Sequence, residues 1–280
     1  MALMRPSSSL GRLNGVLDEL TLVEGDILSE ERMRAIIRRG RPDICFHFAW
    51  HAEPGKYLES PENEILRQKS VALAEMLARA GCRKLVSAGT CFEYEFGPDY
   101  LAEESPLGPK SPYARAKAAL QEDLSKLSST SGMNVLWPRL FYQFGPFENE
   151  RRLVAGIIKS IFDGRPARLT PGGQIRDYLH VEDVAGAIVA AAESDLVGPI
   201  NIGAGRPVSV REVATTIGRL LGRPELIEIG ALPYPRADPM RVCADNRKIL
   251  ARTHWKPIYS LDLGLKQTIE WTLRRKDHFR

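Results

Sequence analysis

The sequence predicts an α/β protein in which a mostly parallel sheet is followed by a smaller C-terminal lobe. Short apolar runs alternate with longer helical stretches through about residue 140, which is typical of a sheet covered by helices. The connections are short, and this favours right-handed crossovers between parallel strands. After Phe144-Gly145-Pro146 the alternation ends, and a Pro-rich loop follows at 233–239. The second half therefore mixes returning pieces of the main sheet with a looser lobe.

Each strand is expected where a short apolar run stops at a polar or glycine-containing turn. In chain order, the runs of the first half span residues 2–4, 20–24, 43–50, 84–88 and 134–140. Residues 43–50 are almost all apolar, as in parallel strands covered on both faces, so we expect this strand to be buried. Further strands are expected at 175–180 and 199–202.

Helices are expected between these strands. Ser29 is the expected N-cap of a helix over residues 32–39, and a second helix covers 62–80. Pro112 suits the first turn of a third helix, which an alanine-rich stretch continues to about residue 126. The helices expected in the second half span residues 153–162, 184–192, 210–221, 246–251 and 261–275.

Composition limits the function classes. The 280 residues carry a net charge of +4, which suits one large or two modest domains and is too small and too evenly spread to indicate a nucleic-acid partner. The four cysteines show neither a Cys-x-x-Cys nor a metal-ligand spacing, which favours a reduced, cytoplasmic compartment. No apolar run approaches 18 residues, so we expect no membrane span. His47 and His51 lack the glutamate of His-Glu-x-x-His, so no metal site is expected.

Tyr113 and Lys117 are the pair of residues around which the predicted chemistry is built. Four positions apart on a helix, their side chains share one face. A free tyrosine has a pKa of about 10 and is a poor base at neutral pH. A lysine cation held close favours the phenolate and lowers that pKa. The pair could then transfer a proton while another group moves a hydride, although the spacing alone also fits a solvated pair.

Several further segments accompany this pair in a fixed order. They are Gly25-Asp26-Ile27, His47-Phe-Ala-Trp50, Ser87-Ala-Gly-Thr-Cys-Phe-Glu-Tyr94, Pro138-Arg-Leu-Phe-Tyr142 with Gly145-Pro146, Arg176-Asp-Tyr-Leu-His-Val-Glu-Asp183, Asn201-Ile-Gly-Ala-Gly205, Ala244-Asp245 and Trp271. Together they resemble the extended short-chain dehydrogenase/reductase family over nearly the whole chain. The branch that they resemble is that of the NAD-dependent sugar-nucleotide epimerases, dehydratases and ketoreductases.

The resemblance implies a Rossmann-like sheet, a bound NAD or NADP and a nucleotide-sugar substrate, and it leaves a homodimer open. It implies that Thr90, Tyr113 and Lys117 are catalytic. The implied cofactor-binding residues are Arg5, Asp26, Ile27, Phe48, Ala49, Trp50, Lys117, Leu140 and Phe141. The implied substrate-binding residues are Tyr142, Arg176 and Arg236, although the family's arginine usually stands one position before Arg236. We expect a cofactor domain over 1–145 with 181–215, and a substrate lobe over 146–180 and 216–280.

Arg5 bears on the choice of cofactor. It stands where NAD-preferring relatives usually place an acidic residue, and a guanidinium there can pair with the 2′-phosphate of NADP. An ordinary surface arginine is the alternative interpretation.

The sequence departs from the family at its N-terminal end. The family begins with a strand, a Gly-x-x-Gly-x-x-Gly turn and a helix, whereas the early glycines here are only Gly11 and Gly15. Without that central strand, residues 44–48 should lack a neighbour on one side. We also expect weaker NAD(P) binding, because the N–H groups of such a turn cradle the pyrophosphate. The sequence therefore fits a truncated sheet, from a late-start gene model or in a protein that has lost firm cofactor binding.

The expected reaction is C4 epimerisation or 4-keto reduction, and the sequence does not separate the two. In the 4,6-dehydratases of the family, Asp and Glu follow the hydroxyl residue and carry the elimination. Here Cys91 and Phe92 follow Thr90, and Glu93 should face the opposite side of an extended segment. Dehydration is therefore not expected. The alternative hypothesis is a catalytically impaired nucleotide-binding or scaffold protein of the same fold.

Overall fold

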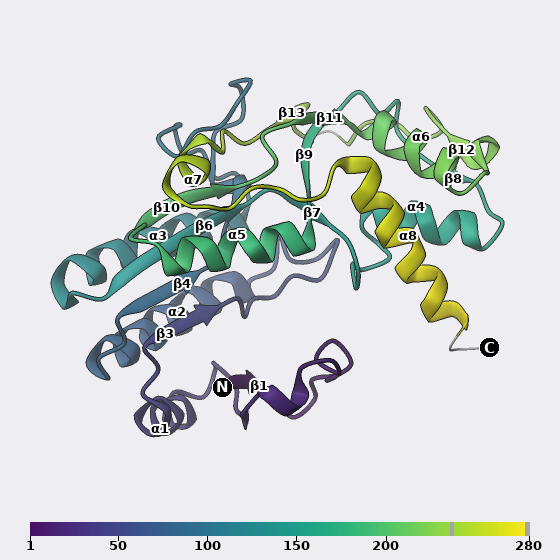
Figure 1. Ribbon diagram of the computed structural model, residues 1–280. Helices are drawn as coiled ribbons and strands as arrows, with labels where there is room; N and C mark the ends of the chain where they lie inside the picture. The colour runs from purple at the N-terminus through teal and green to yellow at the C-terminus, as the bar shows by residue number, and fades with distance from the viewer. Residues whose placement is uncertain (236–237, 278–280) are drawn as a thin grey trace. The chain divides into compact units, whose positions relative to one another are not determined.

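The computed structural model describes residues 1–235 and 238–277. The chain divides into two compact units (Figure 1). Unit 1 comprises Met1–Glu93 and Pro109–Trp137, and unit 2 comprises Tyr94–Gly108 and Pro138–Arg280. Each unit has its own hydrophobic core. No helix in the described part of the chain is long and apolar enough to cross a membrane.

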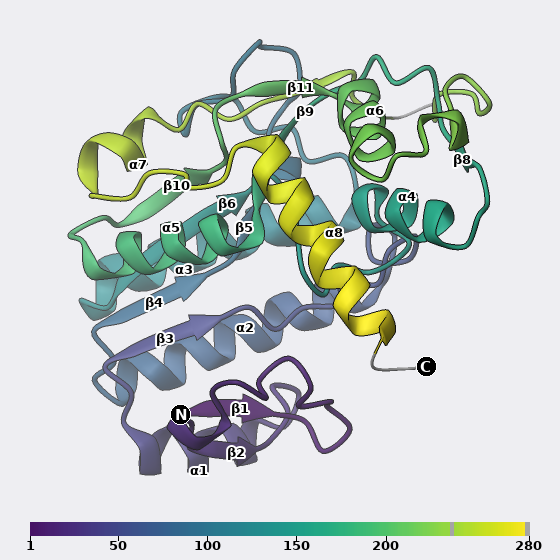
Figure 2. The same cartoon turned by 45° about the vertical axis from the view of Figure 1, so that its right-hand side comes forward.

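Unit 1 contains a parallel sheet in which β4 (Lys84–Ser87) lies between β3 (Ile44–His47) and β6 (Asn134–Leu140). A separate parallel pair is formed by β1 (Ala2–Met4) and β2 (Leu22–Glu24), drawn in purple in Figure 2. These five strands lie close to the predicted ranges and pair in parallel, so the predicted α/β class is confirmed for this unit.

The strand β3 lies at the edge of its sheet. Among the described residues it pairs with β4 alone, as expected for residues 44–48. Ile44 and Phe46 leave 36% and 45% of their surface exposed, and Phe48, just beyond the strand, leaves 50%. The prediction of a buried strand is therefore wrong for these side chains, because no described strand pairs with the outer edge. The strand also ends at His47 instead of continuing to Trp50.

The helices of unit 1 are α1 (Glu30–Gly40), α2 (Glu62–Arg79) and α3 (Pro112–Ser131). Ser29 occupies the N-cap position of α1, but its side chain makes no capping hydrogen bond, so the predicted cap is wrong in this respect. The helices α2 and α3 pack against each other (Figure 2). The largest buried side chains of this core are Leu73, Leu77, Leu85, Leu120, Leu124 and Trp137.

Unit 2 is built around β9 (Ile175–His180). The first half of β9 pairs in parallel with β13 (Arg241–Val242) and antiparallel with β11 (Pro207–Ser209). Its second half pairs in parallel with β7 (Tyr142–Phe144). Strand β9 therefore pairs with short strands from three distant parts of the sequence.

The other elements of unit 2 complete the hydrophobic core of that unit. The remaining strands are β8 (Ala167–Arg168), β10 (Gly198–Ile202) and β12 (Ile227–Glu228), of which β8 and β12 pair in parallel. The helices are α4 (Leu153–Phe162), α5 (Val181–Glu193), α6 (Val210–Leu220), α7 (Arg247–Arg252) and α8 (Leu261–Asp277). Apolar faces of α4, α6 and α8 meet in the core. One-turn 3-10 helices are η1 (Leu17–Glu19), η2 (Cys91–Glu93) and η3 (Pro224–Leu226), with β5 (Gly89–Thr90) directly before η2.

The compact units do not coincide with the predicted cofactor and substrate domains. Residues 138–145 and 181–215, expected in the cofactor domain, belong to unit 2. Compactness reports internal packing and carries no information about which segment binds which ligand. The functional division therefore stays a prediction.

Candidate active site

The candidate active site of unit 1 begins where β4 ends. Ala88, Gly89 and Thr90 follow this strand, and each contributes a different contact. The Ala88 carbonyl accepts a hydrogen bond of 2.9 Å from the Lys117 ammonium. The Thr90 hydroxyl accepts a hydrogen bond of 3.3 Å from the Phe92 N–H, and its own proton stays available. This short segment therefore gathers two of the three predicted catalytic residues.

Tyr113 and Lys117 come from the first turns of α3. Ser111 caps this helix by accepting a hydrogen bond of 3.1 Å from the Ala114 N–H, and Pro112 occupies a position that needs no N–H partner. The helix begins early enough to put both side chains on one face, as predicted. The Thr90 hydroxyl lies beside Tyr113, close enough to lower its pKa in part. The structure thus brings Thr90, Tyr113 and Lys117 together in one unit.

Aromatic rings surround this pair. The Tyr57 ring lies edge-on to that of Tyr113, with centroids 4.8 Å apart. The Lys117 nitrogen lies 3.6 Å from the centre of the Trp50 ring, which is a cation–π contact. The Trp50 indole N–H donates a hydrogen bond of 2.8 Å to Asn63, which is itself buried on α2. Unit 1 therefore holds Trp50 firmly against the ammonium.

Burial sets the protonation of this site. It lowers the pKa of the Lys117 ammonium to about 7, and the Glu93 carboxylate acts in the opposite direction. The neighbouring His47 lies on β3, where its Nε2 is 2.8 Å from the Ser70 hydroxyl oxygen. Burial, followed by the Lys117 charge, lowers the pKa of His47 to about 3, so this imidazole is neutral at pH 7.

The pKa of Tyr113 differs from the sequence expectation. Burial raises it above its usual range, the hydrogen bond with Thr90 lowers it in part, and Tyr57, Glu93 and Cys91 raise it further. The expected lowering by Lys117 is not seen, because the ammonium is directed to the Ala88 carbonyl and the Trp50 ring. This part of the prediction is wrong for the protein without ligands.

Glu93 is a site residue that the sequence interpretation missed. It lies in the helical turn η2 instead of an extended segment, and the turn brings its carboxylate back toward Thr90. The Thr90 N–H donates a hydrogen bond of 2.7 Å to Glu93. The spacing Thr-x-x-Glu is the signature of a capping box, and it could have indicated this turn. The prediction that Glu93 faces away from the site is therefore wrong.

The other predicted cofactor residues of unit 1 follow strand ends. Arg5 comes directly after β1, Asp26 and Ile27 come after β2, and residues 48–50 come after β3. Asp26 closes its turn by accepting a hydrogen bond of 2.9 Å from the Leu28 N–H. The carboxyl ends of parallel strands are where open α/β sheets bind ligands, so these positions fit a dinucleotide.

The predicted residues of unit 2 form a separate group. Leu140, Phe141 and Tyr142 lie at the end of β6 and the start of β7. The Arg176 guanidinium lies 5.1 Å from the centre of the Tyr142 ring and makes an ion pair of 2.6 Å with Asp238. The predicted Arg236 lies outside the described residues.

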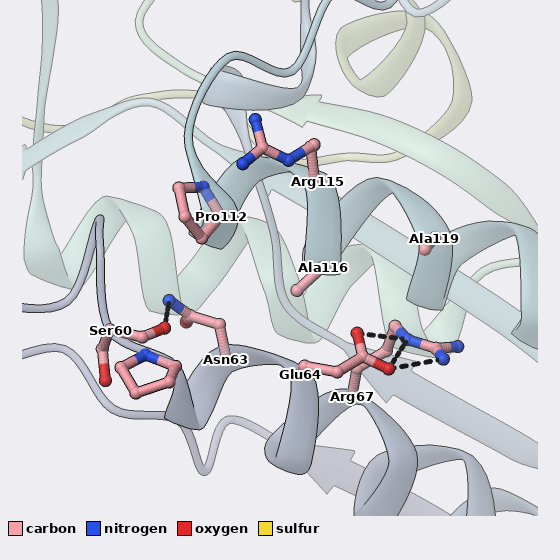
Figure 3. Close-up of a pocket in the computed structure, with 9 residues that line it drawn as sticks. Ser60, Asn63, Glu64, Arg67, Pro112, Arg115, Ala116 and Ala119 are labelled. Atoms are coloured by element: carbon pink, nitrogen blue, oxygen red, sulfur yellow. Dashed lines mark hydrogen bonds and ion pairs between the residues drawn. The ribbon is translucent and has the colours of Figure 1, made fainter.

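Two cavities are lined by residues other than those predicted for the site. In unit 1, a cavity of about 470 Å³ separates the first turns of α2 and α3 (Figure 3). It is lined by Ser60, Pro61, Asn63, Glu64, Arg67, Pro112, Arg115, Ala116 and Ala119, which include no predicted site residue. In unit 2, a cavity of about 540 Å³ beside α4 has several cationic groups in its wall: Arg151, Arg152, Lys159, Arg165 and Arg168. No group of histidine, cysteine or acidic side chains within the described ranges has the arrangement of a metal site.

The α/β fold, and the placement of Thr90, Tyr113 and Lys117 in one unit, agree with the expected resemblance to the extended short-chain dehydrogenase/reductase family. A profile of the NAD dependent epimerase/dehydratase family matches residues 5–203. The chain belongs to this family.

Its relatives act on nucleotide sugars. UDP-glucose 4-epimerase from Mycolicibacterium smegmatis is 28% identical over 265 residues, which cover 91% of this chain and 83% of that protein. UDP-glucuronic acid decarboxylase 1 from Xenopus tropicalis is 27% identical over 84% of this chain. The match spans 58% of that relative's length.

A solved structure shows the same fold. The UDP-glucose 4-epimerase of Thermus thermophilus, in complex with NAD, superposes with a TM-score of 0.84 at 26% identity. The superposition covers 96% of this chain and 90% of that one. The predicted Rossmann-like fold is therefore confirmed.

Proposed function

We propose that this protein catalyses NAD(P)-dependent hydride transfer at a carbon of a nucleotide-linked sugar, as a C4 epimerase or a 4-ketoreductase. The observation that carries the proposal is the convergence of Thr90, Tyr113 and Lys117 at the end of β4. The Thr90 hydroxyl lies beside Tyr113, and the bond from Lys117 to Ala88 holds the ammonium two residues before Thr90.

In this proposal, Tyr113 is the proton carrier. Its phenolic oxygen takes the proton of a sugar hydroxyl when the carbon loses hydride, and returns a proton in the reverse direction. Thr90 lies beside Tyr113 and can orient the same sugar oxygen. Lys117 is a buried cation on the same helix face, and in this proposal its charge favours the phenolate once cofactor and substrate are bound. Because burial lowers the pKa of Lys117 to about 7, the strength of that effect depends on pH near neutrality.

NAD(P), when bound, supplies the acceptor and donor of the hydride. The residues that would hold it are those at the strand ends of unit 1. Asp26 would accept a hydrogen bond from the adenine edge, Trp50 and its neighbours would line the cofactor, and Lys117 would donate to the nicotinamide ribose. Leu140 and Phe141 are proposed to lie beside the nicotinamide.

The substrate residues are proposed in unit 2. Arg176 offers a guanidinium suited to a diphosphate, and Tyr142 lies beside it. The cavity beside α4 supports an anionic ligand, because Arg151, Arg152 and Arg168 contribute cations to its wall. These features favour a substrate with a nucleoside diphosphate, which is the kind of ligand that the names of the relatives indicate.

The elimination of water is not part of the proposal. Cys91 and Phe92 follow Thr90, and neither is a carboxylic acid. Glu93 is a carboxylate in the site, but its oxygens accept hydrogen bonds from Thr90 and Trp137, so it is engaged within the protein. Epimerisation and ketoreduction need only the tyrosine, its neighbours and a hydride.

A substrate panel tests this function. The protein is incubated with UDP- and dTDP-linked hexoses and 4-keto sugars, with NAD⁺ alone or with NADH or NADPH, and the products are identified by NMR. An epimerase interconverts C4 epimers without net consumption of cofactor. A ketoreductase consumes one reduced cofactor for each 4-keto sugar. Formation of a 4-keto-6-deoxy sugar from a hexose would show that the excluded dehydration occurs.

A further inference from the structure

Glu93 is the anion of the candidate site. Its side chain is fully buried. One carboxylate oxygen accepts the Thr90 N–H at 2.7 Å, and both oxygens lie 3.1 Å from the indole nitrogen of Trp137, which donates to them. The carboxylate is therefore fixed by two donors on different strands, β5 and β6.

The three residues after β4 connect this anion to the cation. Lys117 is bonded to the carbonyl of Ala88, and Glu93 is bonded to the N–H of Thr90. Between them, a Cβ on Gly89 would lie 2.3 Å from the Trp137 indole nitrogen and 2.8 Å from a Glu93 oxygen. Only glycine allows so close an approach of backbone, indole and carboxylate.

Trp137 is bonded to the anion and lies near the cation. Its indole N–H is bonded to Glu93, and the Lys117 nitrogen lies 6.0 Å from the centre of the same ring. In a buried environment, two opposite charges near the same side chain interact more strongly than they would in water.

We propose that Glu93 is a positioning residue for the Thr90–Tyr113–Lys117 group, an inference that rests on the proposed function. Its two hydrogen bonds fix the backbone of Thr90, and its negative charge keeps Lys117 in the ammonium form that Tyr113 requires. The two tasks, one geometric and one electrostatic, are carried by the same carboxylate.

A capping box by itself is a structural device, and many such turns have no catalytic role. Two features distinguish this one. A capping glutamate on a surface turn is solvated, whereas Glu93 has no exposed surface and Trp137 donates to it in addition. The residue that it caps is also the one whose hydroxyl lies beside Tyr113.

The other titratable groups around Tyr113 and Lys117 do not replace this anion. His47 on β3 is neutral, Tyr57 lies before α2, and Cys91 lies in η2 beside Glu93. Cys91 contributes a thiol and Tyr57 a phenol, so neither brings a second carboxylate to the site. In the described part of unit 1, Glu93 is thus the carboxylate whose charge acts on Lys117.

Two substitutions separate the two tasks. Glu93→Gln keeps an oxygen that can accept from both Thr90 and Trp137 but removes the charge. Glu93→Asp keeps the charge but shortens the side chain, so that the bond to Thr90 is lost or lengthened. Glu103→Gln is the matched control, because it also neutralises a partly buried carboxylate that accepts a backbone N–H, in this case from Asn201 at 2.8 Å.

The titration of Lys117 is followed by NMR of protein labelled with ¹³C at the lysine Cε, and the resonance is assigned with Lys117→Met. We expect Glu93→Gln to move this titration down by about one pH unit, and Glu93→Asp and Glu103→Gln to leave it in place. This readout does not depend on turnover. If the proposed reaction is absent while the titration moves, the function fails and the charge role of Glu93 stands.

Turnover then tests the link to catalysis. Relative to the wild type, Glu93→Gln should lose about fivefold more activity at pH 8 than at pH 6, because a titration one unit lower removes about nine-tenths of the remaining Lys117 ammonium at pH 8 but only about half of it at pH 6. Glu93→Asp should lose activity by the same factor at every pH. An unshifted Lys117 titration in Glu93→Gln would overturn the proposal. Should that variant not fold, a shift of more than half a unit in Glu93→Asp would overturn it as well.

Discussion

Two buried cations, one in each unit, differ in how their charge is balanced. Lys117 in unit 1 and Arg176 in unit 2 are 4% and 3% exposed. Lys117 is directed to the Ala88 carbonyl and the Trp50 ring. Arg176 makes a direct ion pair with Asp238 at 2.6 Å. Burial is therefore the same for both, and the presence of a contacting carboxylate is the difference.

The difference decides what each charge can do. Without a carboxylate in contact, the Lys117 ammonium has a pKa of about 7 and can change its protonation at physiological pH. A guanidinium remains charged in proteins, and an ion pair holds it in one orientation. The first arrangement suits proton transfer through Tyr113, and the second suits a fixed contact with an anion.

The largest expected effect concerns Tyr113, which shares a helix face with Lys117, the buried cation of unit 1. Tyr113→Phe should reduce turnover by about 1,000-fold, since general acid–base catalysis contributes roughly 10² to 10⁴-fold. Cofactor binding should be unchanged, because the ring and its contact with Tyr57 remain. Stopped-flow absorbance of the nicotinamide measures the step. Reduction at the wild-type rate would remove Tyr113 from the mechanism and leave Lys117 without a catalytic task.

The second prediction tests the protonation of Lys117 through stability. Because burial lowers its pKa to about 7, the unfolded chain binds this proton more tightly than the folded protein does. The free energy of unfolding should therefore rise as pH increases from about 7 toward the ordinary lysine value, by up to about 1.4 kcal/mol per pH unit. Below pH 7 Lys117 is protonated in both states, so its destabilising effect is complete and no longer changes with pH.

Urea denaturation between pH 6 and 9 measures this rise, and Lys117→Met should lack it. Lys126→Met is the control, since Lys126 lies on the same helix with 70% of its side chain exposed. It should follow the wild-type curve. Parallel curves for the wild type and Lys117→Met would mean that Lys117 keeps its ordinary pKa in the folded protein.

The third prediction concerns the paired cation. Asp238→Asn leaves the buried Arg176 charge without its carboxylate, and should reduce the free energy of unfolding by about 2 kcal/mol. Arg176→Met combined with Asp238→Leu should recover most of that loss, because neither charge is then left unpaired. Thermal unfolding of the three variants gives the comparison. If the single variant were as stable as the wild type, the ion pair would not fix Arg176.

The sequence was sufficient to predict the regular elements and to predict that Tyr113 and Lys117 lie on one helix face. The limits of β6, β9 and α4 agree with the predicted ranges. Each has a local signal, an apolar run or a helical pattern, and no distant residue is needed to read it. Tyr113 and Lys117 share a helix face for the same local reason.

The predictions that failed concern features that depend on contacts between distant segments. Whether Ile44 and Phe46 are buried is decided by which strand lies beside β3, and the strand's own composition cannot show this. The Lys117 ammonium is directed to Ala88 and Trp50, and both lie far from it in the sequence. Glu93 is a different case, because the local Thr-x-x-Glu spacing carried the signal. There an extended segment was assumed where the capping box forms a turn.

The smallest expected effect concerns Arg5, a cation that is neither buried nor paired within the described residues. It is exposed directly after β1, where a 2′-phosphate of NADP is proposed to lie. Because both groups are solvated, the contact should contribute about 1 kcal/mol, or roughly fivefold in affinity. Arg5→Ala should therefore weaken NADP binding about fivefold and leave NAD binding unchanged, as measured by calorimetric titration. The effect should shrink at high salt, unlike those at Lys117 and Arg176, because exposed charges are screened. Equal weakening for both cofactors would show that Arg5 does not contact the 2′-phosphate.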